Sequence, residues 1–325
     1  MSTKLHSTYL GPWLGILLLG TLIFANGCGS TTFHPPVLHV YVTHGNNVSV
    51  FAVPSSSSGN VNVAPTASLT GAATGLSDPH RMAFDFSGNT YITNFGGNSV
   101  TVYAPGSTGN TAPIATISGA NTGLDGPSGI ALDFHNNIYV ANSNGNSITV
   151  YAAGASGNAT PTITISGSNT GLDFPNGLAL GFDRTIYVVN EAGNSIEAFD
   201  GNTPGNIAPL VTISGTNTGL NRPHALTLDS YGDIYVVNGS GNSITIYSPG
   251  TTGNIAPVAT VSGSNTGLSN PNGIALDYAG DIYVGNQTAV AIFAPVPAGA
   301  TNVAPAVTIS GSNTGLSSIH DVEFY

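Results

Sequence analysis

The sequence predicts an all-β protein: one six-bladed β-propeller with four-stranded blades, closed by pairing of the C-terminal strand with the N-terminal blade. A tyrosine recurs every 48 residues, at Tyr91, Tyr139, Tyr187, Tyr235 and Tyr283. Each interval contains four short β-type segments separated by turns rich in Gly, Asn and Pro. The two ends of the chain supply complementary parts of one more repeat, which brings the number of blades to six.

Each repeat resolves into four strands. Residues 139–142 and 147–151 alternate in polarity around a Gly-Asn turn, which is typical of a β-hairpin. After a polar Gly/Pro loop, an apolar run such as 258–261 gives a third strand. A Gly-Ser-Asn-Thr-Gly-Leu loop then leads to a fourth segment, such as 272–277. The Asn and Gly of these loops are expected to serve the turns rather than a ligand.

The chain ends predict how the ring closes. The first strand after the leader, 37–43, corresponds to the second strand of a blade, and 320–325 corresponds to a first strand that lacks partners of its own. Pairing these two segments completes the sixth blade and leaves no exposed sheet edge. Small residues such as Gly129 and Gly177 alternate with larger apolar residues in the first-strand segments, which favours close approach of the sheets near the axis.

The N-terminus predicts export. Residues 1–27 have the layout of a signal peptide, because Lys4 and His6 precede an apolar run, 10–24, that is short for a membrane span. The segment 25–28, Ala-Asn-Gly-Cys, resembles a lipobox, and this resemblance implies that Cys28 is lipidated and becomes the mature N-terminus. Ordinary cleavage and an uncleaved anchor are the alternatives, because the first two positions depart from the lipobox pattern.

The expected domains are therefore the signal peptide 1–27, a lipidated Cys28 with a short tether over 28–36, and the propeller over 37–325. Gly29 follows the cysteine, and by resemblance to Gram-negative lipoproteins it implies the outer membrane. The expected location is the cell envelope, with a membrane partner through the lipid anchor. Because Cys28 is the single cysteine, an internal disulfide is excluded.

The charge composition limits the partners. Only 6% of the residues are charged, four Lys and Arg stand against 15 Asp and Glu, and the net charge is -11. A phosphate backbone would be repelled by such a surface, so nucleic acid is not an expected partner. Solubility must therefore depend on Asn, Ser, Thr and Gly. Such a polar, weakly charged surface suits a peptide, glycan or protein partner.

Segments 271–277 (Pro-Asn-Gly-Ile-Ala-Leu-Asp) and 280–284 (Gly-Asp-Ile-Tyr-Val) together resemble the NHL repeat. Five regular copies and a split sixth extend the resemblance over nearly the whole exported chain. It implies a six-bladed NHL propeller, which leaves the function open because propellers carry many unrelated activities.

One column of residues is a candidate site. It follows the proline that precedes each first strand, or Ile319 in the last repeat, and is expected to surround one mouth of the channel; its members are His80, Ser128, Asn176, His224, Asn272 and His320. The three histidines could hold a zinc or similar divalent ion with one position open for water or substrate. Alternatively, all six residues make hydrogen bonds to loop carbonyls, as polar residues at such turns commonly do.

The Pro-His segments at 79–80 and 223–224, with Ile-His at 319–320, resemble strand starts of peptidylglycine amidating lyases. In that family a six-bladed propeller holds a catalytic metal on three histidines, so the resemblance implies His80, His224 and His320 as metal ligands of a lyase or hydrolase. The spacing departs from the alternating blades of the family. Few titratable groups lie nearby, namely Arg81, Arg222 and Asp321, and no catalytic residue can be named.

The sequence therefore favours an envelope-tethered, monomeric binding module that presents a polar top face to a peptide, glycan or protein. A metal-dependent enzyme at the channel mouth is the competing class, and a passive structural role is the third. Asn94 and its equivalents are expected to form turn hydrogen bonds. His44 and His135 are expected to be exposed to solvent.

Overall fold

A computed structural model describes residues 37–54, 57–299 and 301–325, which belong to one compact body. The predicted signal peptide 1–27, Cys28 and the tether 28–36 lie outside the described residues. No helix of the described part is long and apolar enough to cross a membrane.

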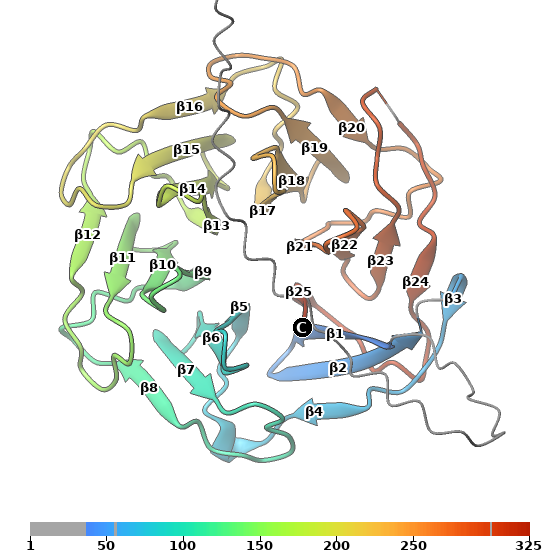
Figure 1. Cartoon of the computed structure of the whole chain (residues 1–325), viewed down its shortest axis with the longest axis horizontal. Coiled ribbons are helices and arrows are strands. Elements are labelled where there is room, and N and C mark those ends of the chain that lie inside the picture. Colours follow the sequence, from blue (N-terminus) through green and yellow to red (C-terminus); the bar gives the residue numbers. More distant parts are fainter. Residues whose placement is uncertain (1–36, 55–56, 300) are drawn as a thin grey trace, which may run out of the picture. The chain divides into compact units, whose positions relative to one another are not determined.

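Six sheets surround a central axis, so the predicted six-bladed propeller is confirmed (Figure 1). From the axis outward the blades are β25-β1-β2-β4, β5 to β8, β9 to β12, β13 to β16, β17 to β20, and β21 to β24, with β3 added outside β24. The elements are β1 Val37–His44, β2 Asn47–Pro54, β3 Gly59–Val61, β4 Ala67–Leu69, the 3-10 turn Ala72–Thr74, β5 Pro79–Phe84, β6 Thr90–Asn94, β7 Ser99–Tyr103, β8 Ala115–Ser118, β9 Pro127–Leu132, β10 Ile138–Asn142, β11 Ser147–Tyr151, β12 Ile163–Ser166, β13 Pro175–Leu180, β14 Thr185–Asn190, β15 Ser195–Asp200, β16 Val211–Ser214, β17 Pro223–Leu228, β18 Ile234–Asn238, β19 Ser243–Tyr247, β20 Ala259–Val261, β21 Gly273–Leu276, β22 Ile282–Gly285, β23 Val290–Phe293, β24 Val307–Ile309 and β25 Ile319–Phe324.

The Asn-Thr-Gly loops between blades are held by buried hydrogen bonds. The Thr122 hydroxyl donates to Gly119 O at 2.8 Å, and the Thr122 carbonyl accepts a 2.7 Å bond from the Tyr151 hydroxyl of β11. Burial raises the pKa of Tyr151 to about 12, because the phenolate would lose its solvation there. The same Tyr-to-Thr bond joins Tyr247 to Thr218, so these loops have the structural role that was predicted.

Two strand pairings close the ring, one near the axis and one at the outer rim. Near the axis, β25 pairs antiparallel with β1, with Val40 opposite Phe324, which confirms the predicted closure. At the rim, β3 pairs in parallel with β24 through Gly59 to Val61. Neighbouring blades elsewhere share only single bridges at this radius, such as Ile117 with Gly157. The seam between the first and last blades therefore has more backbone pairing than any other seam that the structure describes.

A Gly-Asn clasp also links consecutive blades. The Asn158 side chain accepts a 2.8 Å bond from the Asn121 amide, and Gly119 lies beneath it with a φ of 122°. A Cβ at Gly119 would lie 2.6 Å from Asn158 Oδ1, so glycine is required there. Asn62 and Gly311 repeat the arrangement across the closing seam, so the clasp runs around the ring.

The inner strands approach one another very closely. A Cβ at Gly177 would lie 2.5 Å from Ala225 Cα, and one at Gly273 would lie 2.7 Å from Asp321 Cα. The small residues of this column therefore do what the sequence predicted: they let the six inner strands meet around the axis.

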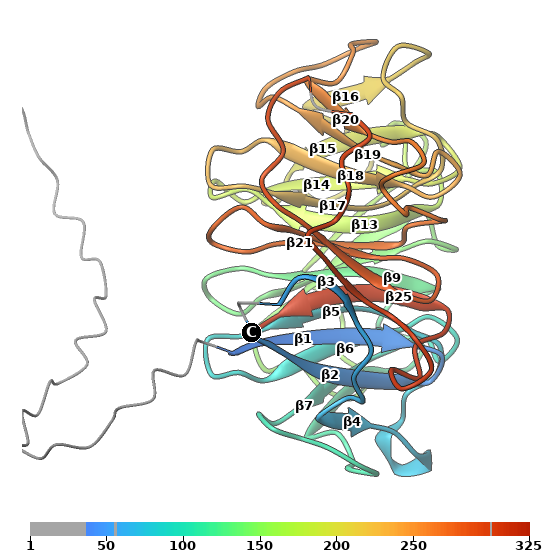
Figure 2. The same ribbon diagram turned by 90° about the vertical axis from the view of Figure 1, so that its right-hand side faces the viewer.

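The propeller has two distinct faces, which are seen edge-on in Figure 2. We call the upper face the one where the inner strands begin, as at Pro79, and the lower face the one where they end, as at Phe84. The loops 85–89 and 133–137 and the C-terminal residue Tyr325 belong to the lower face. Because β1 is antiparallel to β25, β1 begins on the lower face as well.

Closure predicts the effect of a C-terminal truncation. Deleting residues 318–325 removes β25 and exposes the inner edge of β1, so we expect loss of the cooperative melting transition or aggregation. Deleting Tyr325 alone, which lies beyond β25, is the control. Circular dichroism melting and gel filtration measure the outcome; a truncated chain that stays monomeric and melts like the intact one would contradict the closure.

Candidate functional site

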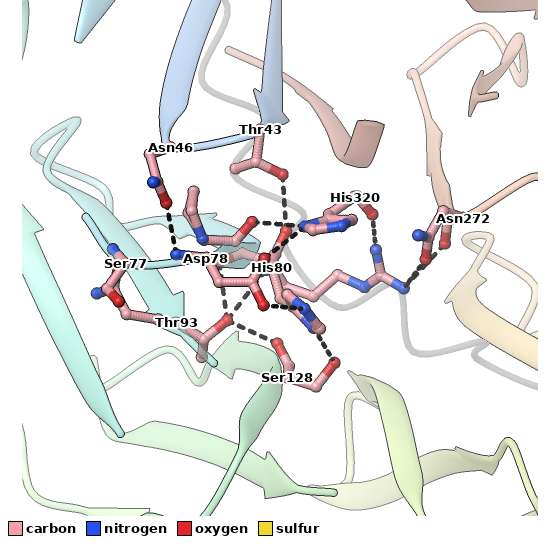
Figure 3. A network of polar contacts seen from close by, with 12 residues as sticks. Thr43, Asn46, Ser77, Asp78, His80, Thr93, Ser128, Asn272 and His320 are labelled. Carbon is pink, nitrogen blue, oxygen red and sulfur yellow. Dashed lines mark hydrogen bonds and ion pairs between the residues drawn. The ribbon is translucent and has the colours of Figure 1, made fainter. Parts of the chain in front are cut away.

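The predicted column gathers at the upper mouth of the channel, because each member lies at the start of an inner strand. Ser128 and Asn176 are buried, and their side chains join in a 2.6 Å hydrogen bond. His80 Nδ1 lies 3.0 Å from Ser128 Oγ on the other side (Figure 3). Asn272 accepts hydrogen bonds from Arg81 through its backbone and side-chain oxygens. The structure thus brings these residues into one polar rim.

Arg81 closes the channel directly below this rim. Its position belongs to the small-residue column of the inner strands, but its long side chain crosses the axis instead of stopping at it. One nitrogen donates to His320 O, and the other donates to His224 O at 3.0 Å and Asn272 O at 2.9 Å. Carbonyl groups from three blades therefore hold the guanidinium. The Arg81 side chain blocks the channel and forms the floor of the polar rim.

The charge of Arg81 is balanced from the last inner strand. Its guanidinium lies 3.7 Å from the carboxylate of Asp321, which also accepts a 3.0 Å bond from the Met82 amide. Burial raises the pKa of Asp321 to about 6, while Arg81 and the amide bonds oppose that rise. Glu323, farther down β25, has a pKa raised by burial and by the neighbouring Asp321 charge.

Hydrogen bonds around the rim fix the orientation of each polar group. Asn176 Nδ2 donates to Glu191 at 2.9 Å, so Asn176 Oδ1 faces Ser128 and accepts its hydroxyl proton. Ser128 Oγ must then accept from His80 Nδ1. A neutral His80 therefore carries its proton on Nδ1 and has its lone pair on Nε2. Glu191, two blades away, sets the tautomer of His80.

Glu191 lies at the centre of the opposite part of the rim. Burial opposes its ionisation, but the nearby His224 at 3.7 Å and the hydrogen bonds from Arg222 and Asn176 outweigh burial and lower its pKa to about 2. Gly239 makes room for this arrangement, since a Cβ there would overlap the His224 ring. His224 Nδ1 also lies 3.1 Å from Pro271 O, which can only accept.

Two of the three predicted histidines meet, and an aspartate joins them. The rings of His80 and His320 have centroids 4.5 Å apart. Asp78 lies 3.7 Å from a ring nitrogen of each. Candidate ligand atoms of these three residues all lie within 4.8 Å of one another, and in the described part of the chain no other such group forms. His224 is not a member, because its contacts are with Glu191 and Pro271.

The environment of this cluster favours neutral imidazoles. Burial lowers the pKa of His80, and burial together with the nearby His80 lowers that of His320 to about 4. His320 Nδ1 donates to Pro79 O at 3.1 Å, which leaves Nε2 with the lone pair. Asp78 has a lowered pKa through its interaction with His80, so it is ionised. Neutral imidazoles and a carboxylate are donors that a divalent ion such as zinc accepts.

The turn that carries Asp78 is a repeated feature of the blades, because the equivalent residues Gly126, Phe174, Arg222, Asn270 and Ser318 also have a positive φ. Asp78 has a φ of 52°, in the left-handed region, and its amide donates to Asn46 Oδ1 at 2.8 Å. Thr43 of β1 donates to His80 O at 2.7 Å (Figure 3). Groups from the first blade thus hold the Asp-Pro-His turn, and His320 joins the cluster through the pairing of β25 with β1 that closes the ring.

Two other sequence expectations have clear outcomes. The Asn column forms the predicted turn bonds: Asn142 accepts from the Asp125 amide at 3.3 Å and donates to Thr149 at 3.1 Å. His135 is exposed, as predicted. The prediction of an exposed His44 was wrong. His44 is buried because it takes the Asn position in the first blade and bonds Ser49 at 2.8 Å.

Comparison with known proteins identifies the fold. No protein-family model matches the chain, and no curated protein matches its sequence. Streptogramin B lyase is 17% identical over 78% of this chain and 76% of its own, with a TM-score of 0.53. An inactive histidine-to-alanine variant of Staphylococcus aureus virginiamycin B lyase, solved with quinupristin, is 13% identical over 81% and 82%, with a TM-score of 0.52.

A nidogen/laminin complex contains a chain that is 16% identical over 88% of this chain and 98% of its own, with a TM-score of 0.63. At such identities the likeness shows a shared β-propeller fold and nothing finer. The chain is thus a six-bladed β-propeller protein, and the NHL resemblance remains a prediction.

The lowered pKa of His320 predicts a pH effect on stability. An unfolded histidine binds its proton near pH 6.5, whereas folded His320 binds it near pH 4. The contribution of His320 is therefore complete above pH 6.5 and is lost as the pH falls toward 4, by on the order of 3 kcal/mol. The substitution His320→Asn introduces the asparagine that the equivalent positions 176 and 272 carry. It should remove this part of the pH dependence.

Urea unfolding with EDTA between pH 7.5 and 4.5 measures the difference. His135→Asn, at an exposed position, should leave the pH profile unchanged. Parallel profiles for the wild-type protein and His320→Asn would show that His320 is not held neutral.

Proposed function

We propose that this protein is an envelope-tethered binding module whose upper rim receives a peptide, glycan or protein partner. The observation that carries this proposal is that the repeats diverge where they reach the upper face. The residues directly after the Asn column all differ from one another; they are Phe95, Ser143, Glu191, Gly239 and Gln287. A position with a purely structural role would carry the same residue type in every regular blade, as the Asn column does.

The rim chemistry supports a polar partner that lies across the surface. Arg81 forms a floor beneath it, so a ligand meets amide, hydroxyl, imidazole and carboxylate groups rather than an open channel. Phe95 stacks on His80 with ring centroids 4.6 Å apart, which adds a flat apolar surface. Sugars and peptides present hydroxyl or amide groups beside apolar patches, and such a rim can match both.

The remaining assignments belong to the same proposal. Export through residues 1–27, lipidation of Cys28 and a tether over 28–36 would hold an NHL-type propeller at the envelope. The nidogen/laminin complex, in which a propeller of this fold occurs, is a protein–protein assembly, the class proposed here.

Partner binding can be tested with a matched rim variant. Phe95→Ser combined with Glu191→Ser installs at both places the residue that the third blade carries at 143, so folding should be retained. Binding of the chain without residues 1–28 to peptide, peptidoglycan-fragment and neutral-glycan panels should fall at least about tenfold. Because few charges are involved, affinity should change less than about threefold between 50 and 500 mM salt.

His135→Ser on the lower face is the control and should bind like the wild-type protein. Equal binding by the rim variant, or a steep salt dependence, would count against the proposal.

The alternative function is a metal-dependent lyase or hydrolase at the same mouth. The observation in its favour is the convergence of Asp78, His80 and His320 with both histidine tautomers fixed. The lyases that share this fold, one of them inactive without a histidine, support testing this class. The ligand set expected from sequence, His80, His224 and His320, competes with the set that includes Asp78.

Elemental analysis after zinc supplementation separates the two ligand sets. If Asp78, His80 and His320 bind the ion, one zinc per chain is lost in Asp78→Asn and in His320→Asn but kept in His224→Ala. Loss in His224→Ala with retention in Asp78→Asn would instead indicate the three-histidine set. If the wild-type protein binds no zinc, the result would indicate that these residues have a structural role.

A further inference from the structure

The lower face presents one exposed aromatic side chain from every blade. We call these residues the aromatic collar: Phe86, Phe134, Phe182, Tyr231, Tyr278 and Tyr325. Their exposed fractions range from 58% for Tyr325 to 106% for Tyr278. All the exposed phenylalanines and tyrosines of the described residues belong to this collar. Contiguous apolar side chains on an otherwise polar surface indicate an interaction site.

Three of the rings form an ordered row. Phe86 and Phe134 have centroids 6.3 Å apart and planes 11° apart, and Phe134 and Phe182 repeat this geometry at 6.4 Å and 10°. A hollow of about 150 Å³ lies beside them and is lined by Leu132 and Leu180 together with Asp133, Asn136 and Arg184. The row therefore borders a hollow in which two leucines extend the apolar surface of the rings.

The collar is not required to form the loops that carry it. In the second blade the turn is held by Asp85 Oδ1, which accepts 2.9 Å bonds from the amides of Ser87 and Asn89. The fifth blade has Ser230 at the position of Phe86, and Asp229 holds its turn in the same way. Tyr325 stacks on Phe84 with ring centroids 5.0 Å apart, but the rings of the loops support neither the turn nor the core and are free to contact a partner.

Two of the three aspartates beside the row are turned inward. Asp85 and Asp133 are buried, and Asp133 pairs with Arg184 at 3.1 Å, whereas Asp183 is exposed beside Phe182. The loops of Tyr231 and Tyr278 add half-buried aspartates, so the charge that this face presents is negative. The net charge of -11 would oppose binding to an anionic surface, so the matching surface is neutral or zwitterionic.

The chain leaves the propeller on this same face. β1 begins at Val37 beside the end of β25, and 36 residues precede it. The described chain therefore begins on the face that carries the collar, and the polar rim lies on the opposite face.

We propose that the aromatic collar docks on a zwitterionic lipid surface. Tyrosine is enriched at the level of the headgroups, where its ring is buried and its hydroxyl stays hydrated. Phenylalanine rings can be buried slightly deeper, at the boundary between the headgroups and the acyl chains. The ammonium group of phosphatidylcholine or phosphatidylethanolamine can lie over such rings. Docking in this orientation turns the upper rim away from the bilayer. The inference does not depend on lipidation of Cys28, because the collar acts through the propeller itself.

Vesicle flotation of residues 37–325, the compact body of the chain, tests the collar without the leader. Neutral phosphatidylcholine/phosphatidylethanolamine vesicles should carry the wild-type propeller upward, with little change between 50 and 500 mM salt. The variant Phe86→Ser, Phe134→Ser and Phe182→Ser, which introduces the residue that the fifth blade carries at 230, should partition at least about tenfold less. Its melting temperature should match the wild-type value, and Phe95→Ser on the upper face should float like the wild-type protein.

Three results would overturn the proposal: no flotation of the wild-type propeller, equal flotation of the triple variant, or flotation that needs anionic lipid. Concentration-dependent dimerisation that the triple variant abolishes would show that the collar is an interface between two copies instead. Upper-rim binding is measured separately with Phe95→Ser/Glu191→Ser, so failure of flotation leaves the proposed binding function standing, and the reverse also holds.

Discussion

The constraint on which the rest of the structure depends is the small space at the axis, where six inner strands meet at backbone distance. Gly177 and Gly273 are required there because a Cβ would collide with the neighbouring strand. Since most positions of this column carry no large side chain, one long side chain can cross the centre, and Arg81 does so. The guanidinium is well held because backbone carbonyls of other blades point toward it, which offsets the cost of burying a charge. The channel is thereby divided into a polar rim above and an open hollow of about 500 Å³ below, whose lining includes Leu132 and Leu180 as well as Asp85 and Glu323.

Most of the architecture could be predicted because it is repeated. A regular period, turn residues and alternating polarity recur in five copies, so errors in one copy are corrected by the others. The unrepeated parts were harder. The pairing of β3 with β24 was missed because Gly59 to Val61 is only three residues long and polar at its start. His44 was misplaced because the first copy has a shorter hairpin, which hides its equivalence to the Asn column.

The candidate site was predictable as a ring of positions but not as a set of contacts. The column of His80, Ser128 and Asn176 converges because register and closure determine where each inner strand begins. Which side chains then touch depends on neighbours outside the column: Asp78 in a left-handed turn, Glu191 after the Asn position, and the space left by Gly239. The collar escaped notice for a different reason. Phenylalanine is a common strand residue, and only the fold shows that Phe86 and Phe134 stand outside the sheet.

The position of β1 has a mechanical consequence. β1 is hydrogen-bonded along its length to β2 and also pairs with β25, so it is an interior strand of its blade although it is the first strand in the described chain. A force transmitted through the residues before Val37 acts along this strand, so both ladders are loaded in shear and many bonds must yield together. An edge strand pulled from its end would instead peel away one bond at a time. The split blade therefore closes the sheet and also makes β1 resistant to a force applied at its N-terminal end.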